Sequence, residues 1–321
     1  MAPTHISATD VSSPIRPINM TRDMQAVMRL LNRVFSPTLD QEGRRALNSM
    51  SNQPSLTHRI QQFGSKVAPG FIWEQGGTLI GNVSVIPTRD KSRVIIANVA
   101  VHEKYRRRGI AQALMEATLD HLEQRDIRTV MLQVDVDNDG AARLYRHLGF
   151  RTLGSTTYWR AASGTLREIA TSADYTVRPL RGHEHAKAFR LDRNSFPADL
   201  NWPDPVSSKT YRGSLWRSLD NFLNGRSEEH WVIDDGHGDL LALGSIWGDW
   251  GRPYRITLRV HPDYQQELTR PLFAKISRRL GYLRRRHASV EHIYQDELTG
   301  HLLNAANFQP KRHLTTMRLD L

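Results

Sequence analysis

The chain has 321 residues, no cysteine, a formal net charge of +11 and a pI near 10.2. Its length is comfortable for two domains, and the lack of cysteine excludes disulfides, thiolate metal sites and a cysteine nucleophile. The charge is spread along both halves, which favours an ordinary basic surface and a phosphate-rich ligand over a dedicated nucleic-acid module. No apolar run is long enough to span a bilayer and residues 1–14 are polar, so we expect a disordered lead and a cytoplasmic location.

The first half predicts alternating strands and helices. Apolar residues recur at helical spacing in two stretches, and Gln75-Gly76-Gly77 separates two β-rich runs as a hairpin turn does. Gly149 follows the last helical run, where glycine commonly ends a helix. The expected elements are a strand at 15–18, a helix at 24–34, a hairpin at 70–87, a strand at 94–101, a helix at 110–124, a strand at 130–136 and a helix at 141–148.

The second half repeats this order. Three segments match at offsets of about 160: residues 15–18 with 177–180, 101–105 with 260–264, and 144–150 with 302–308. Such matches in one order predict an internal duplication. We expect domains at 15–160 and 175–321, joined by a polar linker at 161–174, each a mixed α/β sheet with helices packed on its faces.

The stretch from Val99 to Ala111 has the pattern of an anion-binding site at a helix start. A strand leads through three arginines to Gly109 and then into a helix. Free backbone N–H groups and the helix dipole make a helix start an anion site, and the arginines add charge-assisted hydrogen bonds. Glycine lets the backbone approach a phosphate or adopt a positive φ. Taken alone, the stretch is equally compatible with a solvated basic turn that caps a helix.

A second stretch, Asn138 to Phe150, completes a pattern. Together the two stretches resemble the GNAT acetyltransferase superfamily over residues 15–160, and more weakly over 175–321. The family's pyrophosphate loop, Arg/Gln-x-x-Gly-x-Gly/Ala, is met by Arg106, Gly109 and Ala111. Its later signature, Asn-x-x-Ala-x-x-Leu-Tyr-x-x-x-Gly-Phe, is met at Asn138, Ala141, Leu144, Tyr145, Gly149 and Phe150.

This resemblance implies tandem GNAT-like domains that transfer acetyl from acetyl-CoA to a primary amine of a small molecule, peptide or protein, without a metal. Strand backbone would pair with the pantetheine arm, the arginine–glycine turn would hold the pyrophosphate, and Asn138 would hydrogen-bond the pantetheine. Tyr145 would protonate the departing thiolate, although a core aromatic is the alternative interpretation. The implied cofactor-binding residues are Val99, Val101, Arg106, Arg107, Arg108, Gly109, Ile110, Ala111, Asn138 and Ala141.

The general base stays open. Some family members carry a glutamate on the strand after the long helix, where this chain has Gln133, and glutamine cannot take a proton. Asp135, Glu103, His102 and an ordered water chain remain candidates. The sequence does not identify the acceptor amine either. Acceptor pockets in this fold are built from variable helices and loops early in the chain, here at 35–71.

The second half departs from the family at the decisive positions. Leu268 stands where the phosphate turn needs Gly109, and Leu303 stands where the first half has Tyr145. We therefore expect a degenerate domain kept for packing or substrate binding, and one acetyl-CoA per chain. The chain would be a monomer that imitates a dimer, or a homodimer.

The other class of function is a non-catalytic acyl-CoA-sensing or nucleic-acid- or protein-binding module on the same fold. The basic run 278–286 is interpreted as a solvated helix face rather than a specific nucleic-acid site.

Overall fold

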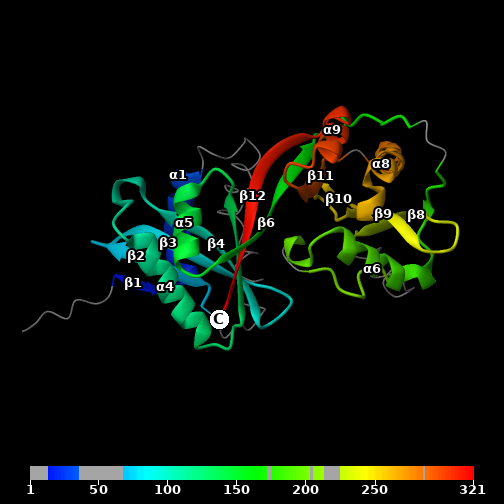
Figure 1. Cartoon of the computed structure of the whole chain (residues 1–321). Coiled ribbons are helices and arrows are strands. Elements are labelled where there is room, and N and C mark those ends of the chain that lie inside the picture. Colours follow the sequence, from blue (N-terminus) through cyan, green and yellow to red (C-terminus); the bar gives the residue numbers. More distant parts are fainter. Residues whose placement is uncertain (1–13, 36–67, 172–174, 203–204, 213–224, 285) are drawn as a thin grey trace, which may run out of the picture. The chain divides into compact units, whose positions relative to one another are not determined.

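A computed structural model describes residues 14–35, 68–171, 175–202, 205–212, 225–284 and 286–321. These residues form two compact units (Figure 1). The first unit comprises the chain up to 132 with 143–151 and 318–321, and the second comprises 133–142 and 152–317. The expected disordered lead and most of the expected acceptor-pocket segment lie outside the described residues. The domain limits at 160 and 175 stay predictions.

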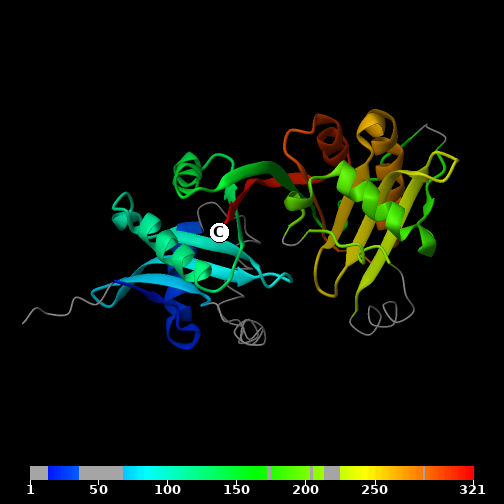
Figure 2. The ribbon, with the colours of Figure 1, turned by 60° about the horizontal axis from the view of Figure 1, so that its bottom comes forward.

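The first unit is a mixed sheet in the order β1-β2-β3-β4-β5, in which only β4 and β5 run parallel. Helix α1 lies on one face and α4 on the other, as Figure 2 shows. β5 and α5 each begin in one unit and end in the other. The elements are β1 (Ile15–Pro17), α1 (Met20–Phe35), β2 (Gly70–Gln75), β3 (Thr78–Pro87), β4 (Arg93–Val101), η1 (Glu103–Tyr105), α4 (Ile110–Glu123), β5 (Thr129–Asp135) and α5 (Asp139–His147).

The predicted helical spacing produces the core of this unit. Leu30 and Leu31 of α1 pack in one buried cluster with Ile72 and Ala100 of the sheet. On the opposite face, a Cβ at Gly81 would lie only 2.8 Å from a methyl of Leu114 in α4. The absence of a side chain at Gly81 therefore lets α4 approach the sheet closely.

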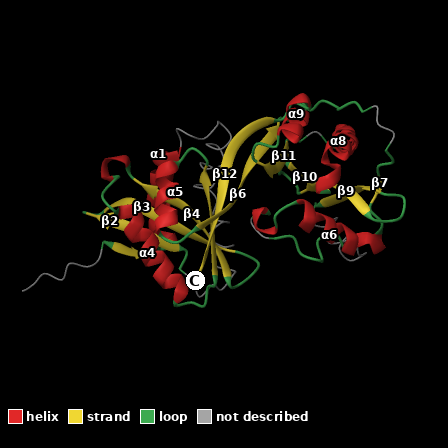
Figure 3. Cartoon of the chain, in the orientation of Figure 1, coloured by secondary structure: helices red, strands yellow, loops and turns green. Residues whose placement is uncertain are grey.

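The second unit has the strand order β12-β6-β11-β10-β9-β8-β7. Helix α6 lies on one face, and α8 and α9 on the other (Figures 1 and 3). The elements are β6 (Arg151–Ala161), β7 (Arg178–Pro179), η2 (Gly182–Glu184), α6 (His185–Ser195), η3 (Ala198–Leu200), β8 (Ser227–Asp234), β9 (Leu240–Gly248), β10 (Tyr254–Val260), η4 (Pro262–Tyr264), α8 (Gln265–Tyr282), β11 (Ala288–Ile293), α9 (Glu297–Ala305) and β12 (Gln309–Asp320).

The predicted repeat extends to side-chain contacts. In each unit an arginine of the first strand binds one acid of the next helical segment and one acid of the hairpin. The two triads are Arg16 with Asp23 and Glu74, and Arg178 with Glu184 and Asp234. A mixed α/β fold built twice is thus confirmed, down to the ion pairs that fix the start of each sheet.

The sequence did not predict an exchange of terminal strands. β6 follows α5 directly, yet it belongs to the second unit, where Ala161 pairs antiparallel with Ala288 of β11. Conversely, residues 318–321 belong to the first unit, where the Leu321 N–H donates to the Arg128 carbonyl at 3.0 Å. Each unit therefore includes a segment that its own half of the sequence does not supply. Within the described ranges, no helix is long and apolar enough to cross a membrane.

Candidate cofactor and active site

The turn before α4 presents a row of free backbone donors. Gly109 adopts φ +77°, and Arg107 also lies in the left-handed region at φ +59°. The first helical hydrogen bond of α4 is donated by Ala113 to the Gly109 carbonyl at 3.0 Å. Among the described residues, the N–H groups from Gly109 to Gln112 donate to no hydrogen-bond acceptor. Consecutive free N–H groups at a helix start form a concave anion site, so the predicted turn has the geometry its chemistry needs.

The arginine side chains have separate roles here. The Arg106 Nε donates to the Val101 carbonyl at 3.1 Å, which ties the turn to the end of β4. The Arg108 guanidinium lies 5.3 Å from the centre of the Tyr105 ring. Arg106 therefore braces the loop, and the backbone supplies most of the anion-binding donors.

β4 and β5 separate beside this turn. Their parallel pairing ends at Ile95 and Met131, so β4 has a free edge beyond Ile95. A bulge follows at Asn98, which takes φ +54° and whose carbonyl accepts from the buried Asn82 amide at 2.9 Å.

The His102 N–H donates to Ile80 on β3, so by strand alternation Val101 and Val99 direct their backbone groups away from β3. An extended amide ligand can pair with this free edge. The Val101 carbonyl already accepts from Arg106, which leaves Val99 as the better-placed partner.

Tyr145 lies near the end of α5 with 6% of its surface exposed. Burial raises the pKa of its phenol to about 12, because the charged phenolate is poorly solvated there. Its ring contacts Phe150 at 6.0 Å between centroids. The hydroxyl has no hydrogen-bond partner within the described part of the chain. Tyr145 is thus both a core aromatic and a neutral phenol at physiological pH, so the two interpretations of the sequence are compatible.

Asn138 begins α5. Its side-chain oxygen accepts from the Ala141 N–H at 3.2 Å, which is an N-cap interaction. The side-chain NH₂ group remains as a donor for a ligand.

The candidate bases are held in structural contacts. The His102 Nδ1 accepts from the Lys104 N–H at 3.3 Å and caps η1, where Glu103 is exposed. Asp135 forms an ion pair with Arg312 at 3.1 Å. These contacts single out none of the three, and the base stays open.

A buried carboxyl group that the sequence analysis missed lies beside Gln133. The Gln133 side-chain amide lies 3.5 Å from Glu291 of β11 and 3.4 Å from the Thr316 hydroxyl. The Thr156 hydroxyl donates to the same Glu291 oxygen at 2.8 Å. Burial raises the pKa of Glu291. The repeat offset maps Gln133 onto Glu291, so the duplication itself was the signal that could have identified it.

In the second unit, the described residues do not form the turn that precedes α4 in the first. α8 begins at Gln265, directly after η4, whereas α4 begins four residues after η1 ends, at Ile110. The residues equivalent to 106–109 are thus absorbed into an extra helical turn, and Leu268 is 1% exposed in the core. Leu303, in the place of Tyr145, is fully buried as well.

The basic run of α8 is largely engaged by its own unit. Arg279 forms two contacts of 2.7 Å with Glu229, and Arg278 lies 3.7 Å from Glu168. Arg285 lies outside the described residues. Elsewhere in the described chain, no group of three acidic or histidine side chains could hold a metal ion.

Comparison with known proteins agrees with this geometry. Residues 25–150 match the family described as acetyltransferase (GNAT) family. The [ribosomal protein bS18]-alanine N-acetyltransferase of Escherichia coli K12 is 43% identical over 53 residues, which is 16% of this chain and 36% of that protein. N-alpha-acetyltransferase 30 of Schizosaccharomyces pombe is 40% identical over 58 residues, 18% of this chain and 39% of that protein. The chain thus spans little more than a third of the length of these relatives.

Two solved structures resemble the fold over most of the chain. A GCN5-related N-acetyltransferase from Sphaerobacter thermophilus has a TM-score of 0.60 at 14% identity and 95% coverage of both chains. A tandem GNAT protein from the clavulanic acid biosynthesis pathway has a TM-score of 0.53 at 16% identity, covering 95% of this chain and 98% of its own. The match to the GNAT acetyltransferase family and the family motifs both lie in the N-terminal half of the chain.

Proposed function

We propose that this protein transfers an acetyl group from acetyl-CoA to a primary amine, with its cofactor site in the first unit. The observation that carries the proposal is the row of N–H groups from Gly109 to Gln112, which have no partner among the described residues, at a left-handed glycine beside the edge of β4 that β5 leaves unpaired. Such a turn suits a pyrophosphate, and such an edge suits the amides of a pantetheine arm.

Bound acetyl-CoA would supply a thioester whose carbonyl carbon accepts the amine and whose sulfur leaves. The backbone donors of the turn would hold its phosphates, and Val99 would align its arm. In the balanced reaction a C–N bond forms, the C–S bond breaks, and the amine loses a proton to a base or to water. Tyr145 would give its phenolic proton to the leaving sulfur.

The protonation state of Tyr145 suits this role. A pKa near 12 keeps the phenol protonated at neutral pH, so it is available as a donor. A protein that only senses acyl-CoA has no use for a proton donor. Tyr145 therefore favours the enzyme over the regulatory alternative.

The test is an amine panel in which CoA release from acetyl-CoA is measured with the full-length chain. The panel holds a polyamine, an amino sugar, a lysine peptide and peptides with a free α-amine, since the two curated relatives above are named as α-amine or alanine N-acetyltransferases. Acceptor-dependent release supports the proposal. Tight acetyl-CoA binding with no release for any amine would favour the sensing alternative.

Tyr145→Phe separates binding from chemistry. We expect kcat to fall about 100-fold, the usual scale of general acid catalysis, while acetyl-CoA affinity changes little. The ring packs on Phe150 and phenylalanine preserves that packing, so the variant should fold. An unchanged kcat would leave Tyr145 only its packing role.

A further inference from the structure

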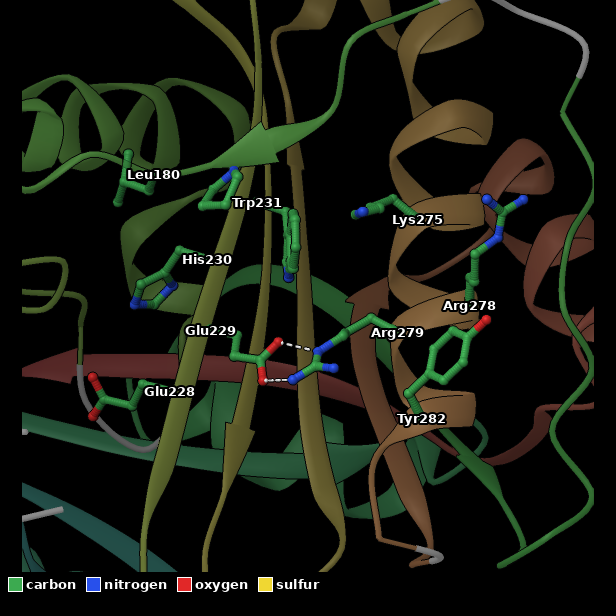
Figure 4. A pocket seen from close by; sticks show the side chains of 10 residues that line it. Leu180, Glu228, Glu229, His230, Trp231, Lys275, Arg278, Arg279 and Tyr282 are labelled. Atoms are coloured by element: carbon green, nitrogen blue, oxygen red, sulfur yellow. Dashed lines mark hydrogen bonds and ion pairs between the residues drawn. The ribbon is translucent and has the colours of Figure 1, made fainter. Parts of the chain in front are cut away.

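A groove of about 610 Å³ opens in the second unit between β8 and α8 (Figure 4). Glu229 and Trp231 point from β8 toward α8, and Lys275 and Arg279 point back from the helix. Tyr282, one helical turn further on, is 75% exposed. Pro179 and Leu180, at the end of β7, line the remaining side. We call this feature the α8 groove.

Lys275 and Arg279, two of the three cations that line the groove, differ in their partners. Glu229 holds Arg279 through two contacts of 2.7 Å, so this pair is nearly neutral. The Lys275 ammonium lies 4.2 Å from the centre of the Trp231 ring, which stabilises the charge but accepts no hydrogen bond. Among the described residues this ammonium has no hydrogen bond or ion pair to an acceptor, and its side chain is half-buried. An anionic ligand that entered the groove could therefore pair with it.

The rest of the lining is mixed. Trp231, the exposed Tyr282 and the ring of Pro179 supply aromatic and apolar surface, and the polar side chains of Glu228, His230 and Arg278 also line the groove. A flat or apolar body fits such a lining, because it covers ring surface without leaving buried polar groups unpaired. The groove therefore combines one open positive charge with a surface for a ring or an alkyl chain.

The equivalent position of the first unit is packed differently. Pro17 pairs with Phe71 as Pro179 pairs with Trp231, so Phe71 takes the place of Trp231. Phe71 is 8% exposed and contacts His121 of α4 edge-to-face at 5.4 Å between ring centroids. Two packed rings thus lie in the first unit where Trp231 faces Lys275 in the second.

We propose that the α8 groove is a second binding site, for a small organic anion in which a carboxylate or phosphate group is carried on an aromatic or apolar body. Lys275 contacts the anion, and Trp231 and Tyr282 contact the body. This site lies in the unit that has lost the acetyl-CoA motif, and it gives that unit a binding role of its own.

The experiment is calorimetric titration of the full-length chain with benzoate, phenyl phosphate and inorganic phosphate, repeated with acetyl-CoA at saturation. We expect saturable binding of benzoate or phenyl phosphate, weaker binding of inorganic phosphate, and no competition by acetyl-CoA. The benzoate and phenyl phosphate arms decide between a carboxylate and a phosphate. The indole N–H signal of Trp231 in NMR spectra, assigned with Trp231→Phe, should shift during the same titration.

Lys275→Met keeps the alkyl stem over Trp231 and removes the charge. We expect it to weaken binding at least 10-fold and Lys275→Arg to restore most of it. Lys91→Met, which removes an exposed lysine in the β3–β4 turn of the first unit, is the matched control and should leave affinity unchanged. Absence of saturable binding, affinity that survives Lys275→Met, or displacement by acetyl-CoA would each overturn the proposal.

Discussion

Two glycines in this chain have almost the same backbone and offer a matched test of the phosphate turn. Gly109 lies before α4 at φ +77°, and Gly236 lies in the β8–β9 hairpin at φ +78°. A Cβ placed on either would meet no other atom within 4 Å. Alanine at each position therefore meets the same conformational penalty and no steric clash within the protein. The two sites differ in their neighbours, because free N–H groups surround only Gly109.

The expected sizes follow from this comparison. A left-handed conformation costs an L-residue about 1–2 kcal/mol relative to glycine, so both variants should lose a similar free energy of unfolding. Gly109→Ala alone should also weaken acetyl-CoA binding, because its methyl group projects into the open space that a phosphate would occupy. We expect at least a ~10-fold rise in Kd, which corresponds to about 1.4 kcal/mol.

The measurements are urea unfolding for stability and calorimetry with acetyl-CoA for affinity, on the wild type and both variants. Equal losses of stability with a loss of affinity confined to Gly109→Ala would support the turn as the pyrophosphate site. Unchanged affinity in Gly109→Ala, or an equal loss in Gly236→Ala, would refute the reasoning.

Two further predictions concern pH. His121 accepts a hydrogen bond from the Ala68 N–H at 3.1 Å, and burial lowers the pKa of its imidazole. Its stabilising effect is therefore present above the pKa of the unfolded state, near 6.5, and is lost as the pH falls toward the pKa of the folded state. His121→Gln should reduce this loss of stability at acidic pH, measured as the urea midpoint between pH 7.5 and 4.5. Burial raises the pKa of Glu291, so ionising its carboxyl group costs stability as the pH rises through the pKa of the folded state. Glu291→Gln should therefore raise the urea midpoint at pH 7 and leave it unchanged below pH 4. A lower midpoint at pH 7 would contradict this prediction.

The sequence predicted those parts of the fold and site that local chemistry encodes. Helical spacing predicted α1 and α4, and the arginine–glycine pattern predicted the left-handed turn at Gly109. The bulge at Asn98 was not predicted, because its signal is spread over β3 and β4: a buried amide from Asn82 satisfies the carbonyl that the bulge exposes. Likewise, the residues around 265 do not predict the extra helical turn that replaces the loop of the first copy. The only sequence signal for it is that Leu268 stands where the first copy has a glycine.

The strand exchange had no local signal at all. β6 starts immediately after Phe150, and its residues alternate as those of any strand do, whichever sheet receives them. The choice depends on partners more than 120 residues away, such as Ala288 opposite Ala161. Glu291 was missed for the same reason, since its contacts to Thr156 and Gln133 exist only after the exchange. Pairings over such separations depend on the summed fit of whole strands rather than on any motif.

The remaining prediction is that each chain binds one acetyl-CoA. It rests on a comparison of the starts of α4 and α8. In the first unit, two left-handed residues turn the backbone before α4, and the N–H groups from Gly109 to Gln112 have no hydrogen-bond partner among the described residues. In the second, η4 passes directly into α8 without a left-handed residue at this position, and the acidic Glu267 lies in the first helical turn, where it disfavours phosphate. Titration of the full-length chain should therefore give one site, which Gly109→Leu removes while the fold persists. Two sites of similar affinity, or one that survives Gly109→Leu, would place the working turn in the other copy.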